Sequence, residues 1–259
     1  MGRDVNESLL VLRDVHKRFG SVAALRGVSV EIRPGRILGI VGGSGSGKST
    51  LANVLLGLER PDAGAALYRN VEVHRLKNQA RRDFRASVQM VFQDPFGSLN
   101  PRMTAAATVE EPLTIQRRGS PADRRAVALA ALAASGLLPP ETFATSFPHA
   151  LSGGQRQRVS IARAIVLAPA VLVADEPASM LDVSIRNGVM RLFRRFADEQ
   201  GMAIVLITHD LSLLIPWCDD VAVMHDGVIV ETGVPRQIAE SPSAPYTRSL
   251  IAAIPQIRM

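Results

Sequence analysis

The sequence Gly42-Gly43-Ser44-Gly45-Ser46-Gly47-Lys48-Ser49-Thr50 lies between one apolar run over residues 37–41 and another over residues 51–56. It satisfies the pattern of a glycine, four residues and then Gly-Lys-Ser/Thr, in the order strand, loop, helix. Glycines allow such a loop to turn successive backbone N–H groups toward one anion, while Lys48 adds a cation and Ser49 adds a hydroxyl. The stretch therefore predicts a phosphate-binding loop for a nucleoside triphosphate with Mg²⁺.

The composition indicates a large domain with an aliphatic core. Of the 259 residues, 47% are hydrophobic and only 4% are aromatic, so Val, Leu, Ile and Ala must build the interior. The single cysteine, Cys218, excludes an internal disulfide and any multi-cysteine metal centre, which fits a reducing compartment. The N-terminus lacks a signal pattern, and the most apolar run, residues 126–138, is shorter than the roughly 20 residues that a membrane span needs. We expect a cytosolic, soluble chain.

The charge balance has two interpretations. The chain carries 30 basic and 24 acidic residues, a net charge of +6, which could serve nucleic acid or an anionic membrane surface. The arginines are spread along the chain without interleaved aromatic residues. This distribution is typical of solvated helix surfaces, so we expect no nucleic-acid partner.

The chain is predicted to be one α/β nucleotide-binding domain with a helical insertion. Short alternating segments over residues 9–41 indicate antiparallel β-sheet that leads into the phosphate loop. After Asp94 the alternation stops, prolines recur, and helices are expected near residues 104–118 and 122–135. The α/β rhythm resumes at residue 151.

The expected architecture is a P-loop NTPase core, that is, a mixed sheet with flanking helices. An N-terminal antiparallel β subdomain and an inserted helical subdomain complete it. The expected boundaries are 9–93 and 151–240 for the core with its β subdomain, 94–150 for the insertion and 241–259 for a C-terminal tail.

Two carboxylates follow a strand that is apolar throughout, residues 170–174. Such a strand is buried on both faces, as in a parallel sheet, and delivers Asp175 and Glu176 to the edge where α/β ligands bind. One carboxylate can hold Mg²⁺ while the other takes a proton from water. His209 follows another apolar strand and is expected at the same edge as Asp175. This shared position favours a contact of His209 with the γ-phosphate over a purely structural role.

Two further features have a functional and a structural interpretation. Ser152-Gly153-Gly154-Gln155 opens a helix with a serine cap, which makes a second anion-binding terminus or an ordinary helix start. Phe19 is an isolated aromatic residue before Gly20, which could stack on a purine ring or pack in the core. The residues alone leave both choices open.

The order and spacing of five elements resemble the ATP-binding cassette family over nearly the whole chain. These elements are centred on Lys48, Gln93, Ser152, Asp175 and His209. The resemblance implies an ATPase whose Gln93 contacts Mg²⁺ and senses an attached transporter subunit. It further implies Asp175 as the metal-binding aspartate and His209 as a switch histidine.

The resemblance also implies the remaining roles. Glu176 matches the general base, and Phe19 the aromatic residue that stacks on adenine. Ser152-Gly153-Gly154-Gln155 matches the helix that, in this family, contacts the nucleotide of a second cassette, so two cassettes join head to tail. Asp182 ends the segment Ser179-Met180-Leu181-Asp182, which resembles the loop that crosses this dimer interface.

Residues 91–104 and 242–248 resemble the peptide and nickel importer subfamily, although Gly43 replaces its usual glutamate and Ala244 its usual histidine. This implies a subunit that hydrolyses ATP on the cytoplasmic side of the inner membrane. The implied partners are a second ATPase subunit (a heterodimer is expected, a homodimer is possible in principle), two transmembrane permease subunits and an extracytoplasmic binding protein. The cargo stays open between peptides, nickel, opines and metallophores.

The competing class is a soluble cassette ATPase in an enzyme, repair or translation complex, or a cassette used as a regulatory switch. The sequence has no long coiled coil within the cassette, no second cassette and no basic stripe that would mark nucleic-acid binding. We therefore favour transport.

Overall fold

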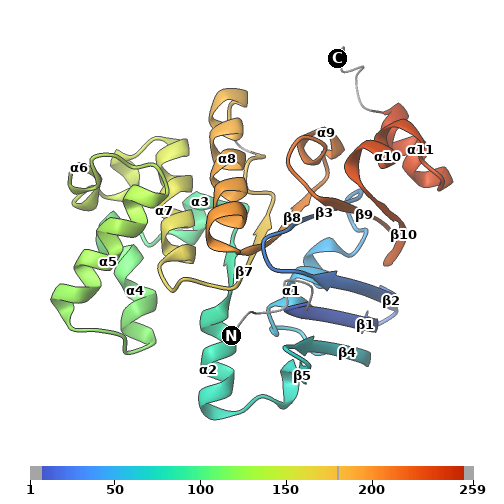
Figure 1. Cartoon of the computed structure of the whole chain (residues 1–259), viewed down its shortest axis with the longest axis horizontal. Coiled ribbons are helices and arrows are strands. Elements are labelled where there is room, and N and C mark those ends of the chain that lie inside the picture. The colour runs from blue at the N-terminus through green and yellow to red at the C-terminus, as the bar shows by residue number, and fades with distance from the viewer. Residues whose placement is uncertain (1–7, 180, 254–259) are drawn as a thin grey trace.

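The computed structural model describes residues 8–179 and 181–253, and a six-stranded mixed sheet lies at its centre (Figure 1). The strand order is β10-β9-β3-β8-β7-β6, and every neighbouring pair is parallel except β9 with β10. The strands are β3 (Ile37–Val41), β6 (Val88–Val91), β7 (Val171–Asp175), β8 (Ala203–Thr208), β9 (Asp220–His225) and β10 (Val228–Gly233).

The central strands are apolar because both faces of the sheet are covered. All six residues of β8 are buried, as are the first four of β7. The parallel pairing places the carboxyl ends of β3, β7 and β8 at one edge of the sheet, which therefore carries the phosphate loop, Asp175 and Thr208.

A second, antiparallel sheet has the order β2-β1-β4-β5 and is drawn mainly in blue in Figure 1. Its strands are β1 (Leu10–Phe19), β2 (Val22–Ile32), β4 (Ala63–Tyr68) and β5 (Val71–Glu72). One apolar cluster joins the buried residues of β1 and β2 to those of α1 (Lys48–Leu55), so this sheet fixes the helix that follows the phosphate loop. The expected antiparallel subdomain is confirmed.

One strand lies in a different sheet from the expected one. Residues 37–41 were predicted to continue the antiparallel sheet, but β3 pairs in parallel with β8 and β9. The reason is that Ile37, Ile40 and Val41 are all fully buried, and only a sheet covered on both faces can bury such a strand. The N–H of Gly35 donates to the carbonyl of Gly201 (2.9 Å), which holds the preceding turn beside the end of α8 (Val183–Gln200).

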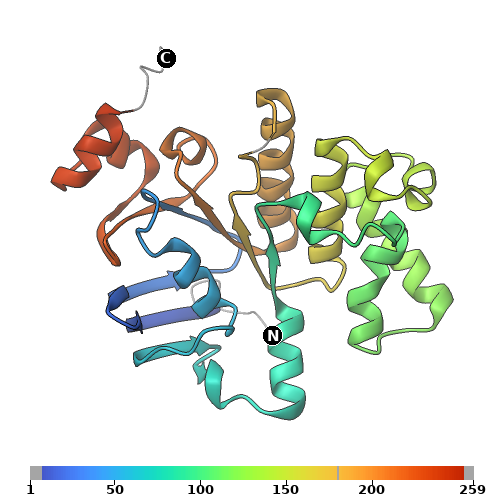
Figure 2. The same ribbon diagram turned by 180° about the vertical axis from the view of Figure 1, so that it is seen from behind.

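The helical subdomain forms a bundle at one end of the central sheet in both Figure 1 and Figure 2. Serine and threonine side chains cap three of its helices: Thr104 caps α4, Ser120 caps α5 and Ser152 caps α7. The helices of the predicted insertion are α3 (Pro95–Ser98), α4 (Ala105–Ile115), α5 (Pro121–Ala134) and α6 (Pro140–Ala144), with a 3₁₀ turn at Pro148–Ala150. Helix α7 (Gly153–Ile165) lies beyond the predicted end of the insertion at residue 150 and packs against α3, α4 and α5. The expected helical insertion is present, and α4 ends three residues earlier than predicted.

The remaining helices are α2 (Asn78–Ser87), α8 (Val183–Gln200), α9 (Leu211–Leu214), α10 (Pro235–Glu240) and α11 (Pro245–Ala252), with a 3₁₀ turn at Val73–Arg75. Helix α11 lies in the predicted C-terminal tail, residues 241–259, for which no secondary structure was predicted. Met180 and residues 254–259 lie outside the described residues. Over residues 8–179 and 181–253, the helices are too short or too polar to cross a membrane.

The core gives a direct stability prediction. Phe193 of α8 is fully buried in the larger apolar cluster, so Phe193→Ala should lower the free energy of unfolding by about 3–5 kcal/mol through lost burial and the cavity left behind. Urea unfolding followed by circular dichroism measures this loss. Arg191→Ala, an exposed change on the same helix, should shift the midpoint little, and equal midpoints for both variants would contradict the assigned core.

Candidate active site

The phosphate loop joins the carboxyl end of β3 to α1, whose first residue is Lys48. Gly47 has a φ of 100°, and a Cβ atom there would lie 2.4 Å from the carbonyl oxygen of Ala24. A Cβ on Gly42 would lie 2.2 Å from the carbonyl oxygen of Met224. Both glycines are therefore required by close backbone approach, which ties the loop to β2 and β9.

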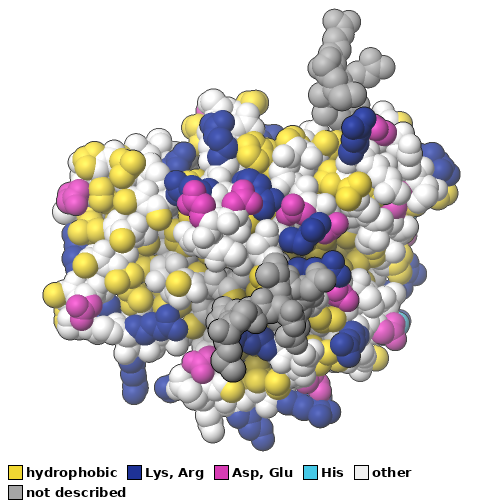
Figure 3. Space-filling view, viewed as in Figure 1, with side chains coloured by type: hydrophobic (Ala, Val, Ile, Leu, Met, Phe, Trp, Pro, Cys, Tyr) yellow, Lys and Arg dark blue, Asp and Glu magenta, His cyan; other side chains and the backbone are white. Residues whose placement is uncertain are grey.

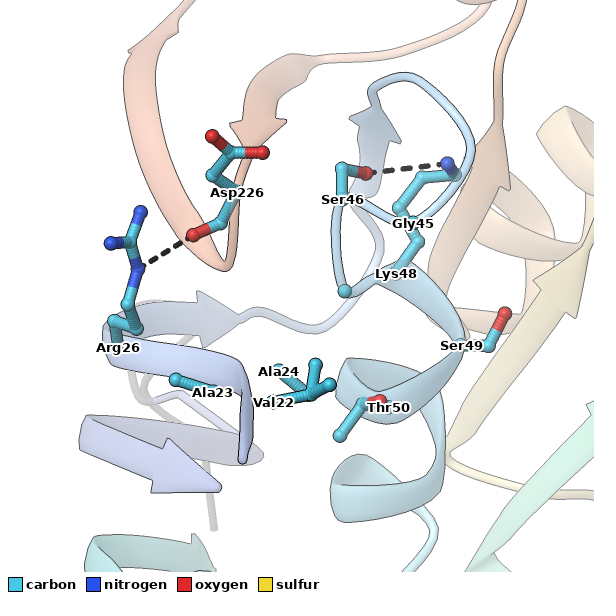
Figure 4. Close-up of a pocket in the computed structure, with 11 residues that line it drawn as sticks. Val22, Ala23, Ala24, Arg26, Gly45, Ser46, Lys48, Ser49, Thr50 and Asp226 are labelled. Carbon is cyan, nitrogen blue, oxygen red and sulfur yellow. Dashed lines mark hydrogen bonds between the residues drawn. The ribbon is translucent and has the colours of Figure 1, made fainter. Parts of the chain in front are cut away.

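Lys48 turns back onto its own loop. Its Nζ donates to the carbonyl oxygens of Gly42 (2.8 Å) and Gly43 (2.7 Å), with a longer contact to Ser46 Oγ (3.4 Å) that Figure 4 shows. Burial lowers the pKa of Lys48, while the carboxylates of Glu176 and Asp175 oppose that shift. The ammonium is thus held in a partly desolvated place that faces two carboxylates.

A cavity of about 490 Å³ lies between the loop and the β1–β2 hairpin (Figure 4). Its volume lies in the range usual for small-molecule sites. Residues from three separate segments line it: Val22, Ala23, Ala24 and Arg26 of β2, the loop and helix residues Gly45, Ser46, Gly47, Lys48, Ser49 and Thr50, and Asp226. The fold thereby brings the predicted residues 45–50 together around one cavity, whereas Gly42, Gly43 and Ser44 do not line it.

Arg26 and Asp226 line the cavity although no sequence pattern predicted them. The Nε of Arg26 donates to the carbonyl oxygen of Asp226 (2.7 Å), which closes one side of the cavity. The two residues lie 200 positions apart, and neither belongs to a motif, so the sequence carried no signal for this contact.

Phe19 lies beside this cavity. It pairs with Val22 across the hairpin, and Val22 lines the cavity whereas Phe19 does not. The Phe19 side chain is 47% exposed, with Lys17 Nζ 5.2 Å from its ring centroid. A half-exposed ring is free to meet a base, so core packing, the alternative left open above, does not describe it.

Gln93, Glu176 and His209 meet at the carboxyl edge of the sheet. Glu176 Oε1 lies 2.7 Å from His209 Nδ1, and Gln93 Nε2 donates to Glu176 Oε2 (3.2 Å). The backbone of Glu176 has a φ of 45°, and its N–H donates to the carbonyl of Ile207 (2.8 Å), which fixes the turn after β7 against β8. Three residues that are far apart in the sequence therefore form one cluster.

Asp175 precedes this cluster as the last residue of β7. Burial and the charge of Glu176 raise the pKa of its carboxyl, and only the ammonium of Lys48 opposes the shift. Such a site holds excess negative charge that a divalent cation relieves. Asp175, Gln93 and Ser49 offer carboxylate, amide and hydroxyl oxygens, the donors that Mg²⁺ prefers, so the residues present fit this metal.

Two predicted elements lie away from the loop. Ser152 and Gln155 form a capping box at the start of α7: Ser152 Oγ accepts from the Gln155 N–H (3.3 Å), and Gln155 Oε1 accepts from the Ser152 N–H (2.8 Å). In Figures 1 and 2, β7 and α8 stand between α7 and α1. Asp182 is exposed at the start of α8, and its side chain caps nothing.

Comparison with known proteins agrees with this geometry. A family described as "ABC transporter" matches residues 25–179, more than half of the chain. The probable D,D-dipeptide transport ATP-binding protein DdpF of Escherichia coli is 40% identical over 98% of this chain and 81% of its own length. The oligopeptide transport ATP-binding protein AppF of Bacillus subtilis is 39% identical over 97% of this chain and 80% of its own length.

The fold is also similar to that of a solved ATP-binding cassette. The dimeric post-hydrolysis state of the ATP-binding cassette MJ0796, bound to ADP and Pi, is similar with a TM-score of 0.78 and 33% identity. The match covers 88% of this chain and 99% of that one. The chain therefore belongs to the ABC transporter family, as an ATPase cassette with the predicted α/β fold.

Proposed function

We propose that this chain is the ATP-hydrolysing subunit of an importer that takes up peptides through separate membrane subunits. The observation that carries the ATPase part is the Gln93–Glu176–His209 cluster at the sheet edge that also bears the phosphate loop. The relatives named for dipeptide and oligopeptide transport, similar over nearly the whole chain, favour peptides over nickel, opines and metallophores.

The loop would bind the phosphates of ATP through its backbone N–H groups and the start of α1. In this structure Lys48 donates to the carbonyls of Gly42 and Gly43, so it would exchange these bonds for phosphate oxygens. Ser49, Gln93 and Asp175 would hold Mg²⁺, which when bound neutralises charge on the phosphates. Phe19 and the hairpin would face the base.

Glu176 would act as the general base that takes a proton from the attacking water. Its side chain is 15% exposed and already lies within hydrogen-bond reach of Gln93 and His209. The side chain of His209 is 62% exposed, so it would be free to contact the γ-phosphoryl group. A general base of this kind accounts for about 10²–10⁴-fold in rate.

A second cassette would complete each site. Ser152-Gly153-Gly154-Gln155 lies across β7 and α8 from the loop of its own chain, so a partner must supply this helix start. The exposed Asp182 would lie at the same interface. The subfamily resemblance favours a heterodimer of two different cassettes. ATP would then be an interface component, and hydrolysis would release the pair.

A membrane subunit would dock on a groove of about 380 Å³ between β6, α4 and α7. Leu58, Phe92 and Ile115 line the groove and are 64%, 46% and 70% exposed. Exposed apolar side chains in a hollow are typical of a site for an amphipathic helix. Phe92 is followed by Gln93, so the groove adjoins the catalytic cluster. The chain would thus be peripheral, on the cytoplasmic side of the inner membrane.

The competing soluble ATPase acting on nucleic acid has less support. On the face shown in Figure 3, basic and acidic side chains are interspersed and do not gather in one stripe. A continuous basic stripe is the usual footprint of nucleic-acid binding.

Glu176→Gln tests the catalytic assignment. The variant should bind ATP, because the loop is unchanged, but lose at least about 100-fold in turnover, because the amide cannot accept the proton. Phosphate release measures turnover, and light scattering should detect an ATP-dependent dimer. Glu199→Gln, an exposed change on α8, should keep wild-type turnover. Wild-type turnover in Glu176→Gln would remove Glu176 from this role.

Asp175→Asn separates metal binding from stability. The pKa of Asp175 is raised from its ordinary 3.8, so its ionised form destabilises the nucleotide-free fold above the folded pKa. The variant should therefore melt at a higher temperature at pH 7 in EDTA, and this gain should vanish as the pH falls toward 3.8. Mg²⁺-dependent ATP binding, measured by calorimetry, should weaken. A gain that is independent of pH would contradict the charge argument.

Ile115→Asp tests the docking groove and the cargo. In cells that contain the permease and binding-protein subunits, the variant should reduce uptake of a labelled dipeptide at least about tenfold, because a charge enters an apolar interface. The ATPase rate of the purified chain should stay within twofold of wild type. Val234→Asp changes an exposed apolar residue outside the groove and should leave uptake intact. Loss of nickel uptake with unchanged dipeptide uptake would overturn the peptide assignment.

A further inference from the structure

Helix α11 reaches the phosphate loop through one side chain. The N–H of Gly43 donates to Tyr246 Oη at 3.0 Å, across 203 positions of sequence. A Cβ atom on Gly43 would lie 3.2 Å from that oxygen, so the hydroxyl occupies the space beside the glycine. The absence of a side chain at Gly43 thus leaves room for the hydroxyl of Tyr246.

The Tyr246 ring is held from its other side. It stacks on His225, the last residue of β9, with ring centroids 3.8 Å apart and an interplanar angle of 16°. Strand β9 pairs with β3, the strand that leads into the loop, with Val41 opposite Val223. The Tyr246 ring therefore lies between the end of β9 and the first turn of the loop. A shift of α11 would break the contact with His225, the contact with Gly43, or both.

The start of α11 is itself anchored by a buried carboxylate. Glu231 of β10 is 8% exposed and accepts from the N–H groups of Ser243 (2.7 Å) and Ala244 (3.0 Å) and from Ser243 Oγ (2.8 Å). Burial alone would raise the pKa of Glu231, but these donors outweigh it and lower the pKa to about 2. Charge-assisted bonds of this kind are strong, so the helix has a fixed starting point.

The peptide groups around Gly43 are engaged on both sides. Tyr246 holds the N–H of Gly43, while Lys48 Nζ holds its carbonyl oxygen at 2.7 Å. Under the proposed function, Lys48 leaves this carbonyl when phosphates bind. The Tyr246 hydroxyl and the N–H of Ser46, which donates to the Gly43 carbonyl (3.3 Å), then keep the first turn of the loop in place.

We propose that Tyr246 is a positioning residue for the phosphate loop and that α11 is a strap whose docking is coupled to nucleotide occupancy. Coupling between two sites is reciprocal. The strap therefore raises nucleotide affinity, and bound nucleotide in turn strengthens the docking of the strap. This inference rests on the proposed nucleotide site and adds a control element outside it.

The test uses the full chain and Mg²⁺–ADP, which is not hydrolysed during titration calorimetry. Tyr246→Phe keeps the ring and removes only the hydroxyl, so it should weaken ADP binding about threefold to tenfold, the range of one neutral hydrogen bond. The melting temperature of the nucleotide-free variant should fall by about 2–4 °C at most, because one hydrogen bond is lost from that fold as well. Ser249→Ala, on the same helix with its hydroxyl bonded to the Pro245 carbonyl, should bind ADP as wild type does.

A double-mutant cycle distinguishes positioning from general stability. Gly43→Ala places a methyl group against Oη, so it should weaken ADP binding in the wild-type background and less in Tyr246→Phe. Hydrogen exchange of the wild-type chain should also slow at residues 243–252 when Mg²⁺–ADP is present.

The outcomes are separable. Wild-type chain that does not bind Mg²⁺–ADP would overturn the nucleotide site and this inference together. Normal ADP binding in Tyr246→Phe, additive effects in the cycle or unchanged exchange at residues 243–252 would each overturn the strap and leave the nucleotide site intact.

Discussion

The parallel pairing of β3 with β8, and of β8 with β7, is the constraint on which the rest of the structure depends. Parallel strands end at the same edge, so the phosphate loop, Asp175, Glu176 and His209 meet although they are far apart in the chain. Parallel pairing also requires both faces to be covered, which explains why β8 is buried at every position.

The charged side chains at this edge of the sheet suit a phosphate anion bound together with a divalent cation. Lys48 is partly desolvated, and Asp175 and Glu176 lie near enough to oppose the lowering of its pKa. Burial, together with repulsion from the carboxylate of Glu176, raises the pKa of Asp175. Bound phosphates would offset the desolvation of the Lys48 ammonium, and a divalent cation would offset the repulsion between the carboxylates. Functional sites commonly carry such a stability cost.

The start of α7 lies away from the phosphate loop of the same chain. The capping box pairs the N–H groups of Ser152 and Gln155, and β7 and α8 stand between this helix start and α1. A groove with exposed Phe92 and Ile115 lies on the surface beside Gln93. Nucleotide, partner cassette and membrane subunit would therefore act on neighbouring parts of one sheet edge.

The sequence by itself determined the features that depend on local patterns. The glycines and Lys48 specify the loop, the apolar run before Asp175 specifies a buried strand, and Ser152 specifies a helix start. The helical insertion followed from the loss of alternation after Asp94. The motif order, not any single motif, indicated the family, and the similarity to ABC transporter proteins confirmed it.

Only the tertiary structure decided the contacts between distant segments. Local alternation could not reveal that β3 leaves the antiparallel sheet, because its partners β8 and β9 lie more than 160 residues away. Arg26 meets Asp226, and Tyr246 meets Gly43, across about 200 positions without any periodic signal. A hydrogen bond between such residues depends on how strands and helices pack, and packing is a property of the whole fold.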